Sequence, residues 1–566
     1  MPKRKKVLLY NITFASDKIC GEDGLYCHGG ERRDGCIFVK SGEKATFDTY
    51  FNSFSHIKYK KYTKVKNVVL KLDIEGRGIA SVYLYKLNAE PQMIASTQAD
   101  GQCELQIDLS SVENDGFLYF TFDAATDSVI RGGGWFADVE MNPVKIGVVI
   151  CTYRREEYLK RNIANLSEYM RSLSDSYFDI FVIDNGRTVE DDFGEGIFVI
   201  PNDNTGGSGG FTRGIKEVLK GDYTHFLLMD DDILFDVNTL YRIYALLCVM
   251  SDEYKDASVG GAMLILDRPY LQEEMGARWK GTKIQSNNKH LDARKPQTVY
   301  LNETLGEPDY NAWFLMCMPV SAPKKYGYPL PFFIKCDDVE YGLRAAEHII
   351  NVSGISVWHE GFDVKYSAEL EYYAKRNDLI VSARYPKGKG VFANFKKLVL
   401  SVGKQLMLQR YFAVDLIFKA YDDFFKGADY FLNLDMEKNH KEIRACGPKM
   451  LTAEQIREEY GIKVDLERIN SHKKWRFKNF ITLNGYLIPK CFYKKGVGQV
   501  NMVTAEGQDL YKYKRVLHYN PKFDCGFVTE IKKSKLIGSW CKLLKYLFKM
   551  LFGYRRVAKQ YRQIQA

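Results

Sequence analysis

Hydrophobic and polar positions alternate along the first part of the chain, from residue 1 to about residue 141. The runs at 68–74 and 81–85 alternate in this way, and Gly, Asn, Asp and Pro separate them from their neighbours. A period of two is typical of strands that bury one face. No helical period of useful length occurs here, so we predict a small antiparallel β-sandwich or barrel over residues 1–141.

After Pro143 the pattern changes to continuous apolar runs separated by helical spacing. The apolar runs, as expected of strands buried on both faces, are 145–151, 178–183, 197–200 and 226–229. Helical spacing follows at 159–170, 211–219 and 237–250, with a glycine-rich turn expected before the second of these. Strands that alternate with helices predict an α/β domain over residues 142–385, with a mostly parallel sheet and ligands beyond its carboxyl ends.

From residue 386 onward the chain is helical in pattern and rich in polar and aromatic residues, so we predict a mainly helical domain over 386–566. Its tail, 532–562, holds ten Lys or Arg and no Asp or Glu, which equals the formal net charge of +10. Apolar residues recur in the tail at helical steps, namely Leu536, Ile537, Trp540, Leu543, Leu544, Leu547, Phe548 and Leu551. A basic amphipathic helix favours binding to a membrane surface. Docking of this stripe on the chain's own core is the alternative.

Composition adds limits to this picture. With 46% hydrophobic and 27% charged residues the chain has the balance of a folded protein. No stretch reaches the roughly 18 apolar residues of a membrane span. The twelve cysteines are scattered, which fits a reduced chain better than a disulfide framework. We therefore expect a cytoplasmic protein that reaches a membrane only through its tail, and no nucleic-acid partner.

Three adjacent carboxylates, Asp230, Asp231 and Asp232, follow the apolar run at 226–229. Their mutual repulsion at a buried strand end is relieved by a divalent cation, and Mg²⁺ and Mn²⁺ prefer oxygen ligands. In a strand the first and third residues point the same way, so Asp230 and Asp232 are the expected pair around one ion. A solvated loop or a helix cap is the other interpretation.

Two further segments carry candidate chemistry. Residues 204–213 hold four glycines within five positions before a predicted helix, an arrangement that favours an anion such as a diphosphate. In 331–344, Asp337 and Asp338 follow an apolar run that we expect to be a strand, and they open an amphipathic helix. One of them could be a general base, although helix capping explains them equally well. His359 ends another apolar run, and a lone histidine is usually structural.

Taken together these segments resemble the galactofuranosyltransferases of the GT-A, family 2 type, most closely those that polymerise the mycobacterial cell-wall galactan. The resemblance covers roughly residues 40 to 430. The segments that carry it are 47–52 (FDTYFN), 133–136 (GGWF), 151–155 (CTYRR), 184–186 (DNG), 204–213 (NTGGSGGFTR), 229–232 (MDDD), 310–313 (YNAW), 333–346 and 358–359 (WH).

The resemblance implies a role for each matching residue. The nucleotide of a UDP-sugar would be bound by Thr152, Tyr153, Arg155, Asp184, Asn204, Gly206, Gly207, Asp230 and Asp231. Mn²⁺ or Mg²⁺ would be held by Asp230, Asp232 and His359. Asp338 would deprotonate the acceptor hydroxyl, with Asp337, Trp313 and His359 around the acceptor and sugar. The acceptor would be a glycan or glycolipid of the cell envelope, at the inner face of the membrane, and self-association of the chain is left open.

The chain also departs from the family pattern. Cys151 stands in place of a Pro, Cys336, Phe314 and Phe362 stand in place of Trp residues, and Ala277 stands in place of a Glu. These positions lie on the sugar or acceptor side, so the acceptor and linkage are open. Donors such as UDP-galactopyranose, UDP-glucose or dTDP-rhamnose stay open too, as does a non-catalytic glycan-binding scaffold on the same fold.

Overall fold

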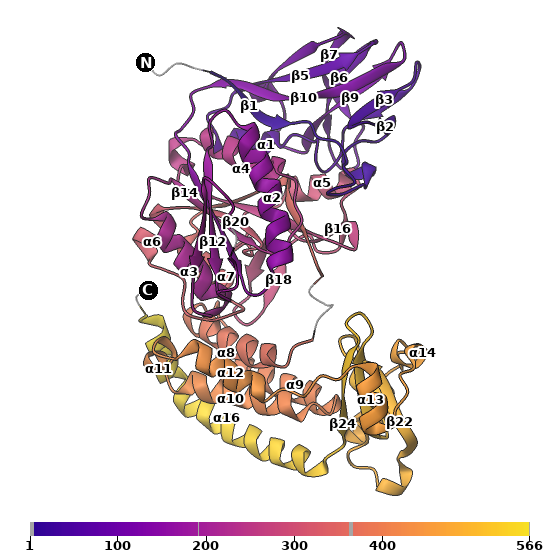
Figure 1. Ribbon diagram of the computed structural model, residues 1–566, viewed down its shortest axis with the longest axis vertical. Coiled ribbons are helices and arrows are strands. Elements are labelled where there is room, and N and C mark those ends of the chain that lie inside the picture. Colours follow the sequence, from indigo (N-terminus) through magenta and orange to yellow (C-terminus); the bar gives the residue numbers. More distant parts are fainter. Residues whose placement is uncertain (1–4, 191, 362–365, 565–566) are drawn as a thin grey trace.

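The computed structural model describes residues 5–190, 192–361 and 366–564. Figure 1 shows a β-rich region at one end of the molecule, an α/β region in the middle, and the C-terminal helices at the other end. The chain passes through these regions in sequence order. The expected mixed α/β, multidomain fold class is confirmed.

The N-terminal region is a sandwich of two antiparallel sheets, as predicted. One sheet has the order β2-β3-β10-β5-β8, with β1 beside β10, and the other has the order β4-β9-β6-β7. Their strands are β1 (Lys5–Asn11), β2 (Glu31–Arg33), β3 (Cys36–Val39), β4 (Lys44–Thr46), β5 (Asn67–Glu75), β6 (Arg77–Tyr85), β7 (Gln92–Asp100), β8 (Cys103–Asp108), β9 (Phe117–Ala124) and β10 (Ser128–Val139). Inward residues such as Leu70, Val82 and Phe120 are buried and form the core between the sheets.

One buried arginine ties this sandwich to the α/β region. Arg242 lies on α4 (Asn238–Cys248) and donates hydrogen bonds to the carbonyls of Asn11 and Phe51 in the sandwich, both at 2.9 Å. It also donates to the carbonyl of Gly354, at 2.9 Å. The guanidinium lies 3.8 Å from the centre of the Tyr10 ring. A buried charge with several partners is costly to disturb, so this contact fixes the two regions to each other.

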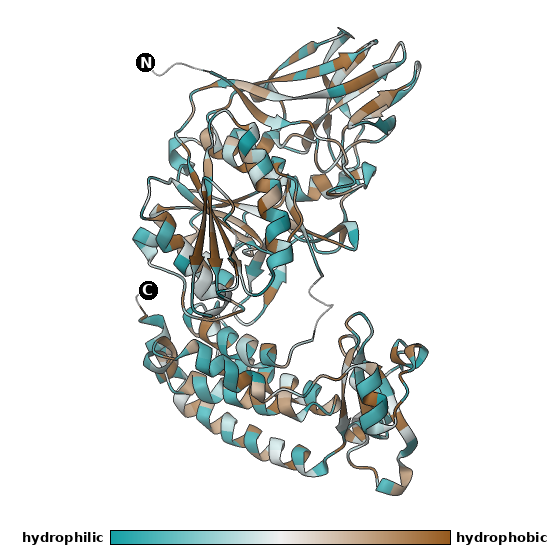
Figure 2. Cartoon of the chain, viewed as in Figure 1, coloured by the Kyte–Doolittle hydropathy of each residue, from teal (hydrophilic) through white to brown (hydrophobic). Residues whose placement is uncertain are grey.

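The α/β region is built on a mixed sheet of order β13-β12-β11-β14-β20-β15-β16-β19, with β21 beside β15. The strands are β11 (Ile146–Thr152), β12 (Phe178–Asp184), β13 (Ile197–Pro201), β14 (His225–Asp230), β15 (Ser258–Ile265), β16 (Arg268–Glu274), β19 (Leu291–Asp292), β20 (Leu315–Pro319) and β21 (Ile349–His359). β13, β12, β11 and β14 are parallel, whereas β20 is antiparallel to β14. Figure 2 shows these strands as the most hydrophobic part of the region, between helices with polar outer faces.

Helices of this region are α2 (Glu156–Ser172), α3 (Gly206–Val218), α4, α5 (Pro296–Glu303), α6 (Ser321–Tyr326) and α7 (Asp337–Ala345), and a small hairpin joins β17 (Ala277–Trp279) to β18 (Ile284–Ser286). The expectation of a glycine-rich turn before residue 211 is wrong, because α3 already begins at Gly206. The glycines let α3 approach the sheet closely. A Cβ on Gly210 would lie 2.2 Å from Cys151 Sγ, and one on Gly214 would lie 2.1 Å from Val149 Cγ1.

The C-terminal region is mainly helical, as expected, but it also contains a small sheet that the pattern did not predict. The helices are α8 (Glu369–Arg384), α9 (Val391–Met407), α10 (Tyr411–Phe425), α11 (Ala428–Leu432), α12 (Met436–Ala445), α13 (Ala453–Tyr460), α14 (Leu466–Ile469), α15 (Phe477–Ile481) and α16 (Lys533–Arg562). The sheet comprises β22 (Lys494–Asn501), β23 (Tyr513–Asn520) and β24 (Cys525–Glu530). Lysines and glycines interrupt the apolar alternation of β22, which hides its period.

The basic tail forms α16, and the helix has two different faces. One face packs on α8, α9 and α10, through Ser539, Leu543, Tyr546, Met550, Tyr554, Val557, Ala558 and Tyr561. The other face leaves Ile537, Trp540, Leu544 and Phe548 between 49% and 65% exposed. The expected single apolar stripe is therefore corrected to a docked face that includes Leu543 and an exposed face beside it. Within the described residues, no helix combines the length and apolar character needed to cross a membrane.

Candidate functional site

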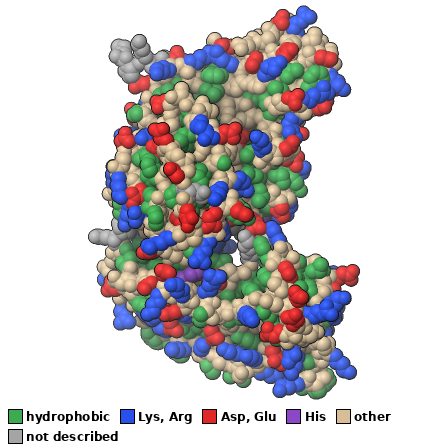
Figure 3. Space-filling view, in the orientation of Figure 1, with side chains coloured by type: hydrophobic (Ala, Val, Ile, Leu, Met, Phe, Trp, Pro, Cys, Tyr) green, Lys and Arg blue, Asp and Glu red, His purple; other side chains and the backbone are tan. Residues whose placement is uncertain are grey.

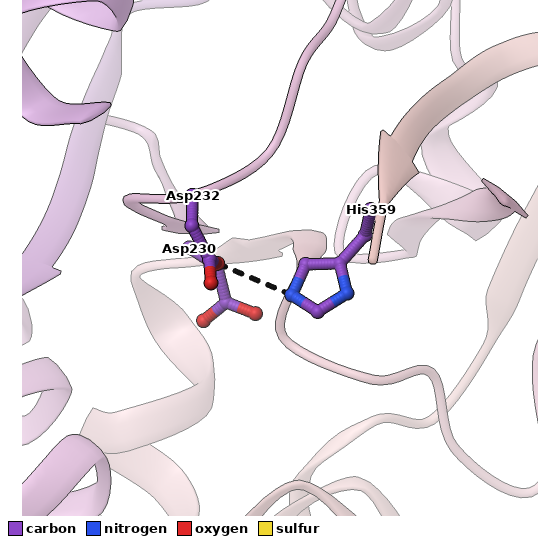
Figure 4. Close-up of side chains that lie close together, drawn as sticks. All are labelled: Asp230, Asp232 and His359. Carbon is purple, nitrogen blue, oxygen red and sulfur yellow. Dashed lines mark hydrogen bonds and ion pairs between the residues drawn. The ribbon is translucent and has the colours of Figure 1, made fainter. Parts of the chain in front are cut away.

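Two strands of the sheet end at the same place and bring three predicted residues together. β14 ends at Asp230, and β21 ends at His359. Each of Asp230, Asp232 and His359 offers one ligand atom, and these atoms all lie within 4.8 Å of one another. Figure 4 shows the imidazole pointing at the two carboxylates, with Nε2 of His359 at 3.1 Å from Oδ1 of Asp232. The ends of two strands that are not adjacent in the sheet thus converge on one spot, at the edge where a ligand site is expected in such a sheet.

The middle residue of the acidic triplet points elsewhere, as the strand alternation predicted. Asp231 is 4% exposed, and its carboxylate accepts hydrogen bonds from Oγ1 of Thr152 at 2.7 Å and from Nη1 of Arg155 at 3.1 Å. Arg155 also donates to Asp232 at 2.6 Å. Asp231 therefore fixes Thr152 and Arg155, and the arginine links the middle carboxylate to the third.

The charges of the cluster suit a cation. Burial, with the negative charges of Asp232 and Asp231, raises the pKa of Asp230 to about 7 against the opposing effect of His359. For His359 burial lowers the pKa, but its hydrogen bond to Asp232 and the charge of Asp230 raise it overall. Two carboxylate oxygens and one imidazole nitrogen match the ligand preferences of Mn²⁺ and are acceptable for Mg²⁺. These residues therefore fit a divalent metal.

A pocket of about 400 Å³ joins this cluster to the second pair of carboxylates. The side chains that line it and enter the argument below are Arg155, Gly207, Phe211, Asp230, Asp232, Trp313, Phe314, Lys335, Asp337, Asp338 and His359. Figure 3 shows acidic side chains gathered next to the hollow between the α/β region and the C-terminal helices. The pocket thus brings together carboxylates from two separate segments of the chain.

The segment before Asp337 is a turn, and the expected strand there is wrong. Phe333, Lys335 and Cys336 adopt left-handed backbone angles, with φ of 73°, 70° and 65°. Non-glycine residues pay a free-energy cost for this conformation, and it persists where surrounding contacts impose it. α7 then begins at Asp337, so both carboxylates lie in its first turn.

Two buried side chains of α8 hold this turn. Asn377 donates from Nδ2 to the carbonyls of Ile334 and Lys335, at 2.9 and 2.8 Å. Arg376 donates from Nη2 to the carbonyl of Phe332, at 2.9 Å. Arg376 and Asn377 are 2% and 0% exposed. The C-terminal helices thereby set the position of Asp337 and Asp338 in the pocket.

Comparison with known proteins gives this site its chemical context. Residues 28–138 match the family model described as galactofuranosyltransferase 2 N-terminal, and residues 147–297 match the model of glycosyl transferase family 2. The chain is 28% identical over 444 residues to galactofuranosyltransferase GlfT2 of Mycolicibacterium smegmatis, which covers 71% of this chain and 67% of the relative. The chain is a glycosyltransferase.

A second relative agrees with the first. Galactofuranosyltransferase GlfT2 of Mycobacterium tuberculosis is 28% identical over 449 residues, which is 70% of this chain and 67% of the relative. Among solved structures, the mannosyltransferase PcManGT from Pyrobaculum calidifontis matches 55% of this chain and 87% of its own, at 13% identity and a TM-score of 0.28. The resemblance to galactofuranosyltransferases is confirmed by the curated relatives and the family models.

Other residues expected on the nucleotide side of the glycosyltransferase lie around the same strand ends. Asp184 is 1% exposed, and its carboxylate accepts hydrogen bonds from the backbone N–H groups of Gly186, Thr188 and Val189. Tyr153 is 41% exposed. Asn204 accepts a hydrogen bond from the N–H of Gly206 at 3.3 Å, just before α3. Asp184 therefore shapes the loop after β12, while Tyr153 is accessible to a ligand.

The start of α3 has one glycine that faces open space. A Cβ on Gly206, whose φ is 72°, would lie 2.1 Å from the carbonyl oxygen of Phe333, so this glycine allows contact with the turn before Asp337. By contrast, no atom lies within 4 Å of a Cβ built on Gly207, which lines the pocket. Gly206 thus serves packing, and Gly207 leaves room beside the helix start.

Trp313, which was expected near the acceptor and sugar, is mostly buried. Its ring meets Phe211 and Tyr341 edge to face, with centroids 5.5 and 6.2 Å apart, and only 5% of the residue is exposed. It reaches the pocket next to Phe314, which is also buried. Phe362 lies outside the described residues. The pocket therefore has an aromatic wall, formed by Trp313 and Phe314.

The two carboxylates of α7 have raised pKa values. Burial, and then the charge of Asp338, raise the pKa of Asp337 to about 7. Burial raises the pKa of Asp338 to about 6, against the opposing effects of the N–H of Val339 and the charge of Lys335. A carboxylate with a pKa near 6 to 7 is well suited to accept a proton at neutral pH.

Sequence reasoning missed Arg376 and Asn377, the two side chains that hold the turn. They lie on a helix that carries no catalytic pattern, and their partners are backbone carbonyls, which leave no sequence signature. Lys335, which lies in the pocket and lowers the pKa of Asp338, was also missed as a site residue. A lysine two residues before an acidic pair was the available signal.

Proposed function

We propose that this glycosyltransferase transfers galactofuranose from UDP-galactofuranose to a hydroxyl of a cell-surface glycan acceptor. The named activity of both curated relatives supports the choice of sugar. The observation that carries the proposal is the shared pocket, where Asp230, Asp232 and His359 meet Asp337 and Asp338. Transfer of a sugar from a diphosphate needs both a site for the leaving group and a base for the acceptor.

Asp230, Asp232 and His359 would hold Mn²⁺ or Mg²⁺ in this proposal. The metal would supply positive charge for the diphosphate leaving group. Arg155 adds a guanidinium next to Asp232, at 2.6 Å, and Gly207 in the first turn of α3 lines the same pocket. Thr152, Tyr153, Asp184, Asn204 and the glycines Gly206 and Gly207 would complete the nucleotide side, together with Asp230 and Asp231.

Asp338 would be the general base, and Asp337 its neighbour in the acceptor site. Its carboxylate lies in the first turn of α7, in the same pocket as the proposed metal ligands. A base that takes the proton from the acceptor while the diphosphate leaves on the opposite side of the sugar inverts the anomeric carbon in one displacement. Trp313 would pack on the sugar or the acceptor.

The acceptor would be lipid-linked, with the enzyme peripheral at the inner face of the cell membrane. The exposed face of α16 supports this part of the proposal. It presents Ile537, Trp540, Leu544 and Phe548 outward from a helix whose segment, 532–562, contains ten Lys or Arg and no acidic residue. Such a helix binds an anionic bilayer by combining apolar burial with charge attraction.

A donor panel tests the proposal. UDP release would be measured with Mn²⁺ and an acceptor glycan, using UDP-galactofuranose, UDP-galactopyranose, UDP-glucose and dTDP-rhamnose in parallel. We expect the highest kcat/KM for UDP-galactofuranose, and loss of activity when EDTA removes the metal. A higher kcat/KM for another donor would overturn the choice of sugar, and unchanged activity in EDTA would overturn the role of the metal.

A further inference from the structure

A second basic segment lies outside α16. Residues 471–495 contain seven Lys or Arg and no Asp or Glu. They connect α14 to β22 and include the short helix α15. The net charge of the chain does not reveal this second basic segment, because the charge of residues 532–562 alone equals that net charge.

The same segment exposes large apolar side chains. Trp475 is 45% exposed, and the others are Phe477 at 75%, Ile481 at 58%, Leu487 at 60% and Phe492 at 62%. Phe477 and Ile481 are four residues apart on α15, so they project from one side of that helix. Large apolar side chains that are exposed and concentrated in one segment are typical of an interaction site.

Buried residues of the same segment contact the C-terminal helices and hold the backbone beneath its exposed side chains. Tyr486 is buried, and its hydroxyl donates to the carbonyl of Leu406 at 2.7 Å and lies 2.7 Å from the hydroxyl of Tyr411. Asn484 is also buried, and it donates to the carbonyl of Met407 at 3.2 Å. Buried residues of the segment thus hold it against the C-terminal helices, while others such as Leu487 face outward.

This segment adjoins the first turn of α16. Nζ of Lys533, the first residue of α16, donates to the carbonyl of Ile488 at 2.7 Å. Figure 1 shows α16 running from this point along the edge of the molecule that faces away from the sandwich. Lys and Arg side chains, with hydrophobic ones between them, follow the same edge in Figure 3. The two basic, apolar elements therefore form one continuous edge.

We propose that residues 471–495 are a second membrane-contact element, which inserts Trp475, Phe477 and Phe492 among the lipids of an anionic bilayer. The charge complementarity and the continuity with the exposed face of α16 select this occupant. Nucleic acid is the less suitable partner, because the aliphatic side chains Ile481 and Leu487 share the surface and bases prefer aromatic or polar contacts. The inference extends the proposed membrane attachment and is independent of the sugar chemistry.

Tryptophan fluorescence can test the two elements separately. Trp135, Trp279, Trp313 and Trp358 are at most 5% exposed, whereas Trp475 and Trp540 are 45% and 49% exposed. In the full chain carrying Trp540→Phe, brominated phosphatidylcholine–phosphatidylglycerol vesicles should quench Trp475, and vesicles should protect it from iodide. The Trp475→Phe chain reports on Trp540 in α16 in the same way.

A double variant and a matched control complete the experiment. Phe477→Ser with Phe492→Ser should weaken partitioning onto anionic vesicles by about tenfold or more, because two exposed phenyl rings no longer enter the bilayer. The control, Ile79→Ser with Met93→Ser, alters side chains that are 48% and 59% exposed on the sandwich, and it should bind like the parent. Vesicles of phosphatidylcholine alone should bind much less.

Two results would contradict the proposed membrane contact of residues 471–495. If brominated anionic vesicles leave Trp475 unquenched, or if an RNA oligonucleotide rather than vesicles protects it from iodide, the assignment of residues 471–495 is wrong. UDP release with a water-soluble acceptor, measured on the same proteins, keeps the two proposals apart. Intact transfer without quenching refutes only the membrane contact, and quenching without transfer refutes only the proposed reaction.

Discussion

The two sides of the pocket are built in different ways. On the proposed donor side, Asp230 and His359 lie at the ends of β14 and β21, and Arg155 provides positive charge beside the carboxylates. On the proposed acceptor side, Asp337 and Asp338 follow a left-handed turn that side chains of α8 hold. The donor side is thus fixed by the sheet itself, and the acceptor side by packing between two regions. Substitutions should therefore separate donor binding from transfer.

The largest effect is expected at the base. Asp338→Asn should lower kcat for transfer by about 10²–10⁴-fold, because the amide cannot accept the acceptor proton. Transfer would be measured with UDP-galactofuranose and saturating Mn²⁺. Asp267→Asn, whose side chain is 67% exposed, is the matched control and should keep the parent rate. A parent rate in Asp338→Asn would assign the base elsewhere in the pocket.

Asp232→Asn should impair the proposed metal site on the donor side of the pocket. We expect transfer to fall by about 10²–10³-fold, since a group that stabilises the leaving diphosphate is weakened. The Mn²⁺ concentration that gives half-maximal rate should rise as well. Titrating Mn²⁺ into the transfer reaction measures both effects, and an unaltered Mn²⁺ requirement would remove Asp232 from the metal site.

Asn377→Ala should lower transfer without altering donor binding, because it changes the turn that positions the carboxylates and not the carboxylates themselves. Loss of its bonds to the carbonyls of Ile334 and Lys335 should displace Asp338 and lower kcat by about 10–10²-fold. UDP binding should stay close to that of the parent, and Asn433→Ala on the surface serves as control. Equal losses in binding and kcat would mean that the substitution disrupts the whole pocket.

The pH dependence should give the smallest effect. Asp338 acts as a base only when it is deprotonated, so activity is lost as pH falls through its raised pKa of about 6. We expect kcat/KM to fall about tenfold between pH 8 and pH 5. Asp230, with its own raised pKa, is the competing cause, and UDP–Mn²⁺ binding over the same pH range separates the two. A flat profile would contradict the assigned base.

The sequence predicted the carboxylates at the end of β14 better than it predicted the turn before Asp337. Strand alternation predicted that Asp230 and Asp232 are separated from Asp231, and the structure places the side chains in this way, although β14 ends at Asp230 and the other two residues lie in the turn after it. The turn before Asp337 was missed, because Pro331 and the apolar residues after it resemble a strand. The conformation depends on Arg376 and Asn377, which are distant in sequence and act through backbone carbonyls.

The start of α3 and the face of α16 were missed for related reasons. Glycines at 206–210 are typical of a turn, but they lie in α3, where Gly210 lets the helix approach β11 and Gly206 lets it approach the turn before Asp337. The pattern of residues 532–562 predicted an amphipathic helix correctly. It did not separate Leu543, which packs on the core, from Leu544, which is 58% exposed. Local hydrophobic periodicity predicts helices and strands well. It does not predict which face of a helix is buried, because the residues that cover that face are distant in sequence.

The central claim is that donor binding and acceptor activation occupy separate halves of one pocket. Calorimetric titration of UDP with Mn²⁺ into Asp338→Asn and Asp232→Asn tests it most directly. The account predicts that Asp338→Asn binds UDP as the parent does and that Asp232→Asn loses Mn²⁺-dependent binding. Loss of UDP binding in Asp338→Asn, or parent-like Mn²⁺-dependent binding in Asp232→Asn, would contradict it.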